Sequence, residues 1–590
     1  MASVCREVVT LQLGHFSNYV GTHWWNLQDA ALCYDPDSHS PPSELLSDVL
    51  FREGVTLGGQ TTYTPRLITL DLKGSLSTLR QEGSLYETGK EVRTFTWEGE
   101  VMTHRESPPA KNSFLQDLDR LDEGQLLAEG DFSATQAQES EALSAGGIAM
   151  ATVNTSLERA QKRYSLEGSV RVWSDFLRVH LHPRSMMVIN QYNHDGESNR
   201  LEAFGQGEAL CRSATVLEEL EDRLHFFVEE CDYLQGFQVL CDLQDGFSGL
   251  GSGVTELLHD AYGGRGIFTW GLAPVRHPDT SPVKELYHLV NSALGLVSLS
   301  NHSSLFCPLT LRGGLGRCPA PPTSFPHLQF DSSLWYHSSA VLAAALDTMT
   351  VPYRQTQGGG PMWQLSDALA VSGRKVAAAY SALPFPMMLG TSLPDTLSSY
   401  GDSLPWRPLS ACGELGDGQS FGQSVTLRGI EAQSLVSALA PGTRPSTPLH
   451  TCSSGEEVLA SFVWRHYPST PVAVHWISSP CKLTPPFPQI FSPTLGVTGL
   501  LEPSPRAPQT AVGSVPVLSS LQSTPALHPC LTDLWRAASA QDPRRLASFL
   551  GAGTEQGDLQ EALEDLRTLA QCYRGILEPS PLGSSEDESD

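Results

Sequence analysis

The stretch FQVLCDLQDGFSGLGSGVTELLHDAYGGRGIFTW, residues 237–270, decides the fold class. It opens with an apolar run typical of a buried strand, which the glycine-rich residues 246–253 and the helical pattern of residues 254–262 follow. Residues 266–270, Gly-Ile-Phe-Thr-Trp, then predict a second strand. A strand, a helix and a strand in this order form a right-handed βαβ unit, so the two strands are expected to be parallel.

The start of the chain repeats this order of elements. Residues 8–13, Val-Val-Thr-Leu-Gln-Leu, predict a buried strand, Gly14–Asn18 a turn, and the apolar residues from Val20 onward a helix. Residues 65–72 predict another strand, which ends in the turn Lys73–Gly74. The alternation predicts an α/β fold with a mostly parallel sheet and helices on both faces.

The remaining segments differ in character. Residues from about 100 to 165 are rich in Ser, Ala, Glu, Gln and Gly and predict a flexible insertion. Residues 217–230 and 559–573 show the apolar spacing of amphipathic helices. Residues 480–530, rich in Pro, Ser and Thr, predict a loop region, and residues 584–590 predict a solvated acidic tail.

The composition argues against several classes of function. The chain has 65 Asp and Glu against 38 Lys and Arg, a net charge of −27, which disfavours binding to nucleic acid or to an anionic membrane. Its twelve cysteines include no C-x-x-C pair, which argues against a structural zinc ribbon. No segment resembles a secretory signal or reaches the ~20 apolar residues that span a bilayer. We therefore expect a cytoplasmic protein with reduced thiols, in peripheral rather than transmembrane contact with any membrane.

The glycine-rich segment is the first candidate for a binding site. Gly249, Gly251, Ser252 and Gly253 lie between a predicted strand and a predicted helix, where backbone N–H groups and the helix dipole favour a phosphate. The alternative is a connection whose glycines allow a helix to pack closely on the sheet. The residues alone leave both interpretations open.

Three histidines raise the question of a metal site. His180, His182 and His194 have Asp175 and Asp195 nearby. The first two histidines alternate with apolar residues, however, and a half-buried strand explains that spacing more simply. We therefore predict no metal site, and since G-x-S-x-G and H-E-x-x-H motifs are absent, we predict no catalytic residue.

Five blocks of the sequence resemble tubulins and occur in the same order. They correspond to the first strand and loop, the second strand, the segment before the glycines, the glycine segment, and the central helix with the loop after it. These blocks are residues 6–21, 63–72, 231–238, 247–253 and 345–353. The resemblance implies a Rossmann-type nucleotide-fold domain, followed by a smaller α+β domain and C-terminal helices.

Further blocks are similar to the misato family of divergent tubulin relatives. They are residues 172–185, 192–196 and 201–207. This family is implicated in mitochondrial distribution, morphology and fusion, is found in the cytoplasm and at the mitochondrial outer surface, and has been linked to spindle microtubules. The resemblance implies protein partners at the mitochondrial outer membrane, with tubulin or chaperonin as alternative partners.

The resemblance also indicates which residues would contact a nucleotide, and several of them differ from those of tubulins. Gly14 and Asn18 are kept from the tubulin loop Gly-Gln-Cys-Gly-Asn, whereas His15 and Phe16 are new. We expect Phe16 to fill the space that a base would occupy. Lys73 stands where tubulins have an acidic residue that supports magnesium, and we expect it to be an exposed turn residue.

The other nucleotide contacts are altered as well. Phe247, Ser248 and Leu250 replace small residues of the tubulin glycine loop, and residues 307–310 read Cys-Pro-Leu-Thr instead of Cys-Ile-Asp-Asn. Residues 364–369 lack the asparagine of the element that positions water for hydrolysis. The resemblance thus implies a pseudo-GTPase without a bound cofactor, with GTP as the alternative. The degenerate site consists of Gly14, His15, Asn18, Gly249, Gly251, Ser252 and Gly253.

These features divide the chain and predict its function. Residues 1–340 are assigned to the tubulin-like domain, 341–480 to a middle α+β domain, 481–530 to the loop region, and 531–590 to helices with the acidic tail. The predicted function is a non-enzymatic regulator of mitochondrial organisation that acts through protein contacts. The alternatives are a GTP-dependent switch and a cytoskeletal factor that acts with tubulin or its chaperonin in spindle assembly.

Overall fold

The computed structural model describes most of the chain. It covers residues 6–32, 43–55, 59, 61–79, 109–122 and 163–575, with short gaps at 197, 278–279, 317–319, 414–418, 438–443, 469, 508–509 and 543. The predicted acidic tail and most of the predicted insertion lie outside these residues. One part of the insertion is folded, contrary to the prediction, because helix α2 (Ser113–Asp122) buries Phe114 and Leu121.

The first sheet has six parallel strands in the order β5-β4-β1-β6-β7-β8. The strands are β1 (Glu7–Leu13), β4 (Leu67–Lys73), β5 (Met186–Asn193), β6 (Leu234–Asp242), β7 (Gly266–Leu272) and β8 (Leu305–Leu309). The four strands that the sequence predicts here are all present, within a few residues of their expected ends. From β1 the chain first extends the sheet to one side and later to the other, so the strand order reverses between β1 and β6.

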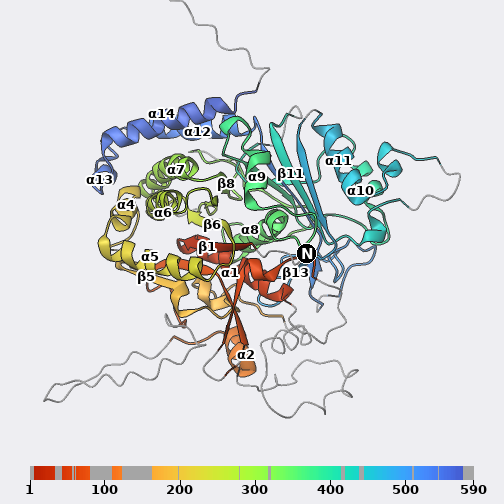
Figure 1. The fold of residues 1–590 in the computed structure, drawn as a ribbon, viewed down its shortest axis with the longest axis horizontal. Coiled ribbons are helices and arrows are strands. Elements are labelled where there is room, and N and C mark those ends of the chain that lie inside the picture. Colours follow the sequence, from red (N-terminus) through yellow and green to blue (C-terminus); the bar gives the residue numbers. More distant parts are fainter. Residues whose placement is uncertain are drawn as a thin grey trace, which may run out of the picture.

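Helices cover both faces of this sheet (Figure 1). The helices of one face are α5 (Ala214–Glu229), α6 (Phe247–Ala261) and α7 (Pro282–His302), with α4 (Phe204–Cys211) packed on α6. The helices of the other face are α1 (His15–Ala31) and α8 (Trp335–Met349). Within β1, Val8 belongs to one hydrophobic core and Val9 to the other. Burial on both faces explains why this strand is mostly apolar and why its polar residues Thr10 and Gln12 are buried as well.

A second sheet of five strands follows, in the order β10-β9-β15-β11-β12, with helices α10 (Leu393–Ser399) and α11 (Gly455–His466) beside it (Figure 1). Its strands are β9 (Ala378–Ala382), β10 (Arg407–Pro408), β11 (Gly422–Arg428), β12 (Val472–Ile477) and β15 (Val517–Ser523). The interval 481–530 was predicted as a loop region, but it contains β15, a buried strand in the middle of this sheet. Strand β15 was not predicted because its sequence, Val-Leu-Ser-Ser-Leu-Gln-Ser, is rich in polar residues that are more typical of a loop.

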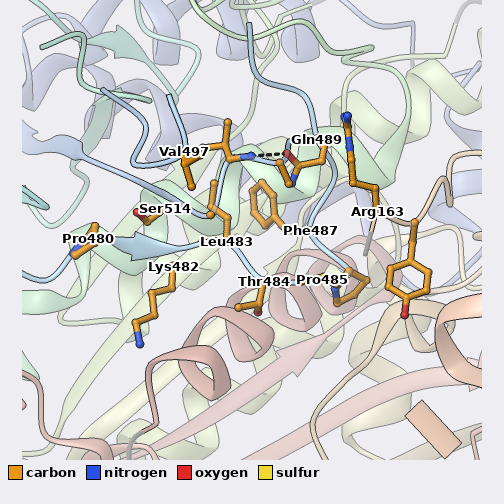
Figure 2. A pocket seen from close by; sticks show the side chains of 15 residues that line it. Arg163, Pro480, Lys482, Leu483, Thr484, Pro485, Phe487, Gln489, Val497 and Ser514 are labelled. Carbon is orange, nitrogen blue, oxygen red and sulfur yellow. Dashed lines mark hydrogen bonds between the residues drawn. The ribbon is translucent and has the colours of Figure 1, made fainter. Parts of the chain in front are cut away.

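The connection between β12 and β15 adds its apolar side chains to the core that contains α1 and α8. Strands β13 (Cys481–Lys482) and β14 (Ser514–Val515) pair within this connection and help to enclose a cavity of about 320 Å³. Leu483 and Phe487 line this cavity, and the Gln489 side chain accepts a hydrogen bond from the Val512 backbone at 2.9 Å (Figure 2).

Helix α8 is buried between the two sheets, and Asp347 near its end ties it to its neighbours. The Asp347 carboxylate accepts a hydrogen bond from Gln28 of α1 at 2.8 Å and pairs with Arg354 at 2.8 Å and with Arg428 of β11. Burial raises the pKa of Asp347, but the two guanidinium groups outweigh burial and lower it overall. The carboxylate is thus ionised and neutralises two buried cations at the junction of the sheets.

The remaining elements complete the fold. The hairpin β2 (Phe51–Val55) and β3 (Thr61–Pro65) precedes β4, and α9 (Met362–Leu369) follows α8. Helices α12 (Leu527–Ser539), α13 (Ala547–Leu550) and α14 (Gln556–Cys572) end the described chain, with α12 and α14 against α7 (Figure 1). Helix α14 confirms the amphipathic helix predicted near the end of the sequence. In the part of the chain that the structure describes, no helix is long and apolar enough to cross a membrane.

Candidate functional site

The reversal of strand order marks one crevice in the first sheet. In doubly wound folds, ligands bind at the carboxyl ends of the strands where the order reverses, which lies here between β1 and β6. Gly14 directly follows β1, and Asp242 is the last residue of β6. Helix α1 begins at His15, and its first N–H groups have no partner within the helix.

The Asp242 carboxyl group binds the N-terminus of α1. Its Oδ2 accepts a hydrogen bond from the Phe16 backbone at 2.9 Å. Its Oδ1 accepts hydrogen bonds from the backbone N–H and the hydroxyl of Ser17, at 2.7 and 2.6 Å. Because N–H groups at a helix start are the ones that would bind a phosphate, a side chain of the protein itself occupies the place of an anion.

Gly14 makes this contact sterically possible. Its φ of +115° lies in a region that residues with a side chain rarely adopt. A Cβ atom added to Gly14 would lie 2.4 Å from Oδ2 of Asp242. The glycine that resembles a tubulin nucleotide contact therefore accommodates an internal carboxyl group in this chain.

A second hydrogen-bond network centres on Asp71, in β4. Three side chains donate to its Oδ2 at 2.8 to 3.1 Å: His15 through Nδ1, Asn18 through Nδ2 and Trp173 through Nε1. The Leu72 backbone donates to its Oδ1 at 2.8 Å. The structure therefore brings His15 and Asn18 together beside Gly14, as the sequence predicts, and Asp71 holds them both.

The carboxyl groups around the crevice differ in their protonation. Burial raises the pKa of Asp71, but the charge and hydrogen bond of His15 outweigh burial, so the pKa is lowered overall. Burial and the nearby Asp245 raise the pKa of Asp242 well above its usual range, although the hydrogen bonds from Ser17 act in the opposite direction. Burial likewise raises the pKa of Asp245 to about 7. Asp71 is thus the carboxylate of the crevice that is most readily ionised.

Aromatic side chains fill the space beside the start of α1. Phe16 is buried, and its ring centroid lies 5.3 Å from that of Trp335, the first residue of α8. Tyr19 packs against the same tryptophan at 5.7 Å, and the His15 ring packs on that of His194 at 3.8 Å, tilted by 34°. Phe16 is therefore part of the core next to the crevice, where a planar base would need room.

The glycine-rich segment is helical, which corrects the predicted loop. Helix α6 begins at Phe247, whereas the sequence places the helix start at residue 254. The predicted site residues Gly249, Gly251, Ser252 and Gly253 consequently lie inside the helix. Glycine is a poor helix former, by about 1 kcal/mol relative to alanine, so tertiary packing has overridden the local preference.

The packing around α6 shows what these glycines do. A Cβ added to Gly249 would lie 1.9 Å from the Phe204 carbonyl oxygen of α4. A Cβ added to Gly251 would lie 2.4 Å from the Cys241 sulfur of β6. The glycines allow close approach of α4 and β6, which is the packing alternative that the sequence had left open.

Other residues that the resemblance singled out lie away from the crevice or face solvent. Lys73 is exposed at the end of β4, where the sequence predicts a turn lysine. Residues 307–310 are buried in and directly after β8. Asp367 is exposed on α9, whose first residue, Met362, would contact a Cβ placed on Gly266 at the start of β7. Helix α9 thus lies at the opposite end of the sheet from Gly14.

One group of described residues has the spacing of a metal site. Ligand atoms of His15, Asp71 and His194 lie within 4.8 Å of one another. Both oxygens of Asp71 already accept hydrogen bonds, and His15 Nδ1 is one of the donors. A metal ion would have to displace these bonds, so the residues fit a hydrogen-bond network better than a ligand set.

The histidines that the sequence singled out do not form one cluster. His180 lies 3.5 Å from Asp122, and His182 stacks on Phe226 at 4.8 Å, whereas His194 packs on His15. The segment that contains His180 and His182 is not a strand, but it does bury its apolar residues alternately, as predicted.

Several residues that organise the crevice carry no clear signal in the sequence. Asp242, Asp245 and Trp335 are not among the predicted site residues, although they contact Phe16, Phe247 and His15, which the resemblance to tubulins singles out. One signal was present in the sequence: Asp242 is an acidic residue at the carboxyl end of a buried strand, just before the glycine-rich segment. A carboxylate at that position is unfavourable for phosphate binding and favourable as a helix cap.

The fold and the crevice together define a tubulin-like protein: a doubly wound parallel sheet, a buried helix that leads to a second sheet, and a crevice between β1 and β6. Family comparison agrees, since residues 164–355 match the family described as "Tubulin domain". Residues 6–120 match the family described as "Misato Segment II tubulin-like domain".

Individual relatives extend over nearly the whole chain. "Protein misato homolog 1" of Danio rerio is 62% identical over 596 residues, covering 100% of both chains. "Protein misato homolog 1" of Homo sapiens is 50% identical and covers 98% of this chain and 99% of its own. "Protein misato" of Drosophila melanogaster is 30% identical and covers 96% and 98%. The chain belongs to the misato family, which confirms the resemblance found in the sequence.

Proposed function

We propose that this misato-family protein is a pseudo-GTPase that regulates mitochondrial distribution, morphology and fusion through protein contacts. The observation that supports the pseudo-GTPase assignment most strongly is the Asp242 carboxyl group on the N-terminus of α1. The position that would hold a phosphate is taken by the chain itself.

A nucleotide phosphate at α1 would have to displace this carboxyl group. Displacement breaks three hydrogen bonds to Phe16 and Ser17, and a buried polar group left without a partner costs about 1–3 kcal/mol. If Asp242 is ionised, its charge about 4 Å from a phosphate charge adds roughly 4 kcal/mol of repulsion at an effective dielectric constant of about 20. Both effects disfavour binding of GTP in this crevice.

The mitochondrial part of the proposal rests on membership of the misato family. The net charge of −27 disfavours direct adhesion to anionic lipid, so we infer attachment through a protein at the mitochondrial outer membrane. The protein would then be shared between the cytoplasm and that surface, as a peripheral component.

Two assays test the two parts of the proposal separately. Purified protein incubated with GTP and Mg²⁺ should release no more phosphate than buffer alone, and clear turnover would refute the pseudo-GTPase assignment. In cells depleted of the protein, the mitochondrial network should change shape and recover on re-expression. An unchanged network after complete depletion would refute the mitochondrial role.

A GTP-binding switch is the second candidate, and one observation favours it. The pKa of Asp242 is raised, so its protonated form competes less strongly for the α1 amides than a carboxylate would. GTP binding in the crevice should then strengthen as the pH falls and Asp242 becomes protonated. Saturable binding with this pH dependence, lost when the crevice is altered, would select the switch over the pseudo-GTPase.

A further inference from the structure

A cavity of about 520 Å³ lies at the start of α7. Its lining comes from the first two turns of α7, from the segments that follow β7 and β8, and from the chain that follows α12. Its polar side chains are Arg276, Glu285, His288, Arg312, Gln541 and Arg545. We call this cavity the arginine pocket. It shares no lining residue with the Asp242 crevice, so its chemistry is independent of the proposed function.

The charge of the arginine pocket is opposite to that of the protein as a whole. It contains three arginines and one carboxylate, in a chain whose net charge is −27. Glu285 pairs with Arg276. Neither Arg312 nor Arg545 forms an ion pair with a residue that the structure describes. Two arginines that no described carboxylate neutralises create, in one cavity, a local potential that attracts anions.

Among the residues that line the arginine pocket, Arg312 has a buried side-chain nitrogen without a described partner. Its Nε is buried and has no hydrogen-bond acceptor among the described residues, although every guanidinium nitrogen is a donor. Burial lowers the pKa of Arg312, and the charge of Arg276 lowers it further. A buried guanidinium nitrogen without an acceptor among the described residues is unfavourable, so its presence at a cavity wall points to a ligand that supplies one.

Two neighbouring features add to the preference for an anion. Helix α7 begins at the pocket, where the Ser281 side chain caps it by accepting a hydrogen bond from the Lys284 backbone, and the positive end of the helix dipole lies there. Burial, followed by the charges of Arg312 and Lys284, lowers the pKa of His288 to about 4. His288 is thus neutral at pH 7 and offers one N–H donor without adding positive charge.

We propose that the arginine pocket binds a small phosphate-bearing molecule, with Arg312 donating hydrogen bonds to the phosphate oxygens. The planar guanidinium group matches two phosphate oxygens at once, which makes arginine the preferred residue for this role. The volume lies within the range of about 300–1,000 Å³ typical of small-molecule sites and exceeds the needs of inorganic phosphate. Val283, Leu286 and Leu289 provide an apolar wall for the rest of the ligand.

Calorimetric titration with pyrophosphate, ADP and GDP at constant ionic strength tests the proposal. The wild type should bind at least one of these probes saturably. Arg312→Gln should weaken binding about tenfold or more, the order expected for lost hydrogen bonds between charged groups. Arg465→Gln is the matched control, because Arg465 is an exposed arginine paired with Asp402 and should leave binding unchanged.

The Arg312→Gln variant should remain folded, because a neutral side chain replaces a half-buried cation that has no ion-pair partner among the described residues. Its melting temperature should equal or exceed that of the wild type. Vesicles with and without a phosphoinositide identify the source of the phosphate. Vesicle binding that pyrophosphate displaces supports a lipid headgroup, and binding of free nucleotide alone supports a soluble metabolite.

Three results would overturn the proposal. The first is the absence of saturable binding for every probe. The second is equal weakening by Arg312→Gln and Arg465→Gln, which would indicate non-specific attraction. The third is binding that Arg312→Gln retains but Asp242→Ala changes, which would place the anion in the crevice.

Discussion

Substitution of Asp242 by alanine should destabilise the protein by about 3 kcal/mol. About 1 kcal/mol follows from the loss of a helix N-cap acceptor. A further ~2 kcal/mol follows because a second backbone N–H of α1 is left buried without a partner. Asp242→Asn keeps one oxygen acceptor and should therefore lose roughly half as much. Asp402→Ala is the control, because the Asp402 side chain is 98% exposed and surface changes usually stay within about 0.5 kcal/mol.

The effect of Asp242→Ala should depend on pH in a defined direction. Folding raises the pKa of Asp242, so its contribution to stability is complete below the unfolded-state pKa and declines as pH rises through the folded-state value. Urea unfolding followed by tryptophan fluorescence should therefore give a larger difference between wild type and variant at about pH 5 than at about pH 8. Equal stability at the lower pH, or a larger difference at the higher pH, would refute the assigned role of Asp242.

Three further predictions concern other parts of the fold. Asp347→Ala should cost about 3–5 kcal/mol in urea unfolding, because it leaves two buried guanidinium groups unpaired, and a loss below about 1 kcal/mol would contradict this role. The wild type should lose stability between about pH 4 and pH 7, because folding raises the pKa of Asp245 to about 7 and the native state then binds more protons than the unfolded chain. In thermal unfolding, Asp245→Asn should make the melting temperature depend less on pH between about pH 4 and pH 7. An unchanged pH dependence would contradict the raised pKa of Asp245. Gly249→Ala should lower the melting temperature, because its Cβ would lie 1.9 Å from the Phe204 carbonyl oxygen. Gly557→Ala, whose Cβ would meet nothing within 4 Å, should leave the melting temperature unchanged or raise it.

The fold class could be predicted because the central strands carry a strong local signal. Residues 8–13 and 237–241 are mostly apolar and buried throughout, which is typical of strands between two layers of helices. The start of α6 could not be predicted in the same way, because it depends on contacts made elsewhere. A Cβ on Gly207 of α4 would lie 1.8 Å from the Gly246 carbonyl oxygen, so the glycines reflect helix packing and not a flexible loop.

The polar strand β15 and the cap on α1 escaped prediction for a related reason. In β15, Ser519 lies within hydrogen-bond distance of Ser381 on the adjacent strand at 3.1 Å, so a serine is satisfied in a buried position. Asp242 meets Ser17 across 225 positions of the chain. Neither contact leaves a pattern in local sequence, whereas Gly14, His15 and Asn18 could be selected because they follow a recognisable strand.

In the proposed pseudo-GTPase, the Asp242 carboxyl group takes the place of a nucleotide phosphate in the crevice. The most direct measurement is the guanine nucleotide content of Arg312→Gln protein that is purified without denaturation, then denatured and analysed by chromatography. The Arg312→Gln variant is used because it should weaken binding in the arginine pocket, so that nucleotide retained there contributes less. The account predicts GTP and GDP far below one equivalent per chain. Close to one equivalent would show that Asp242 and Phe16 accommodate a nucleotide, and the protein would then have to be treated as a GTP-binding switch.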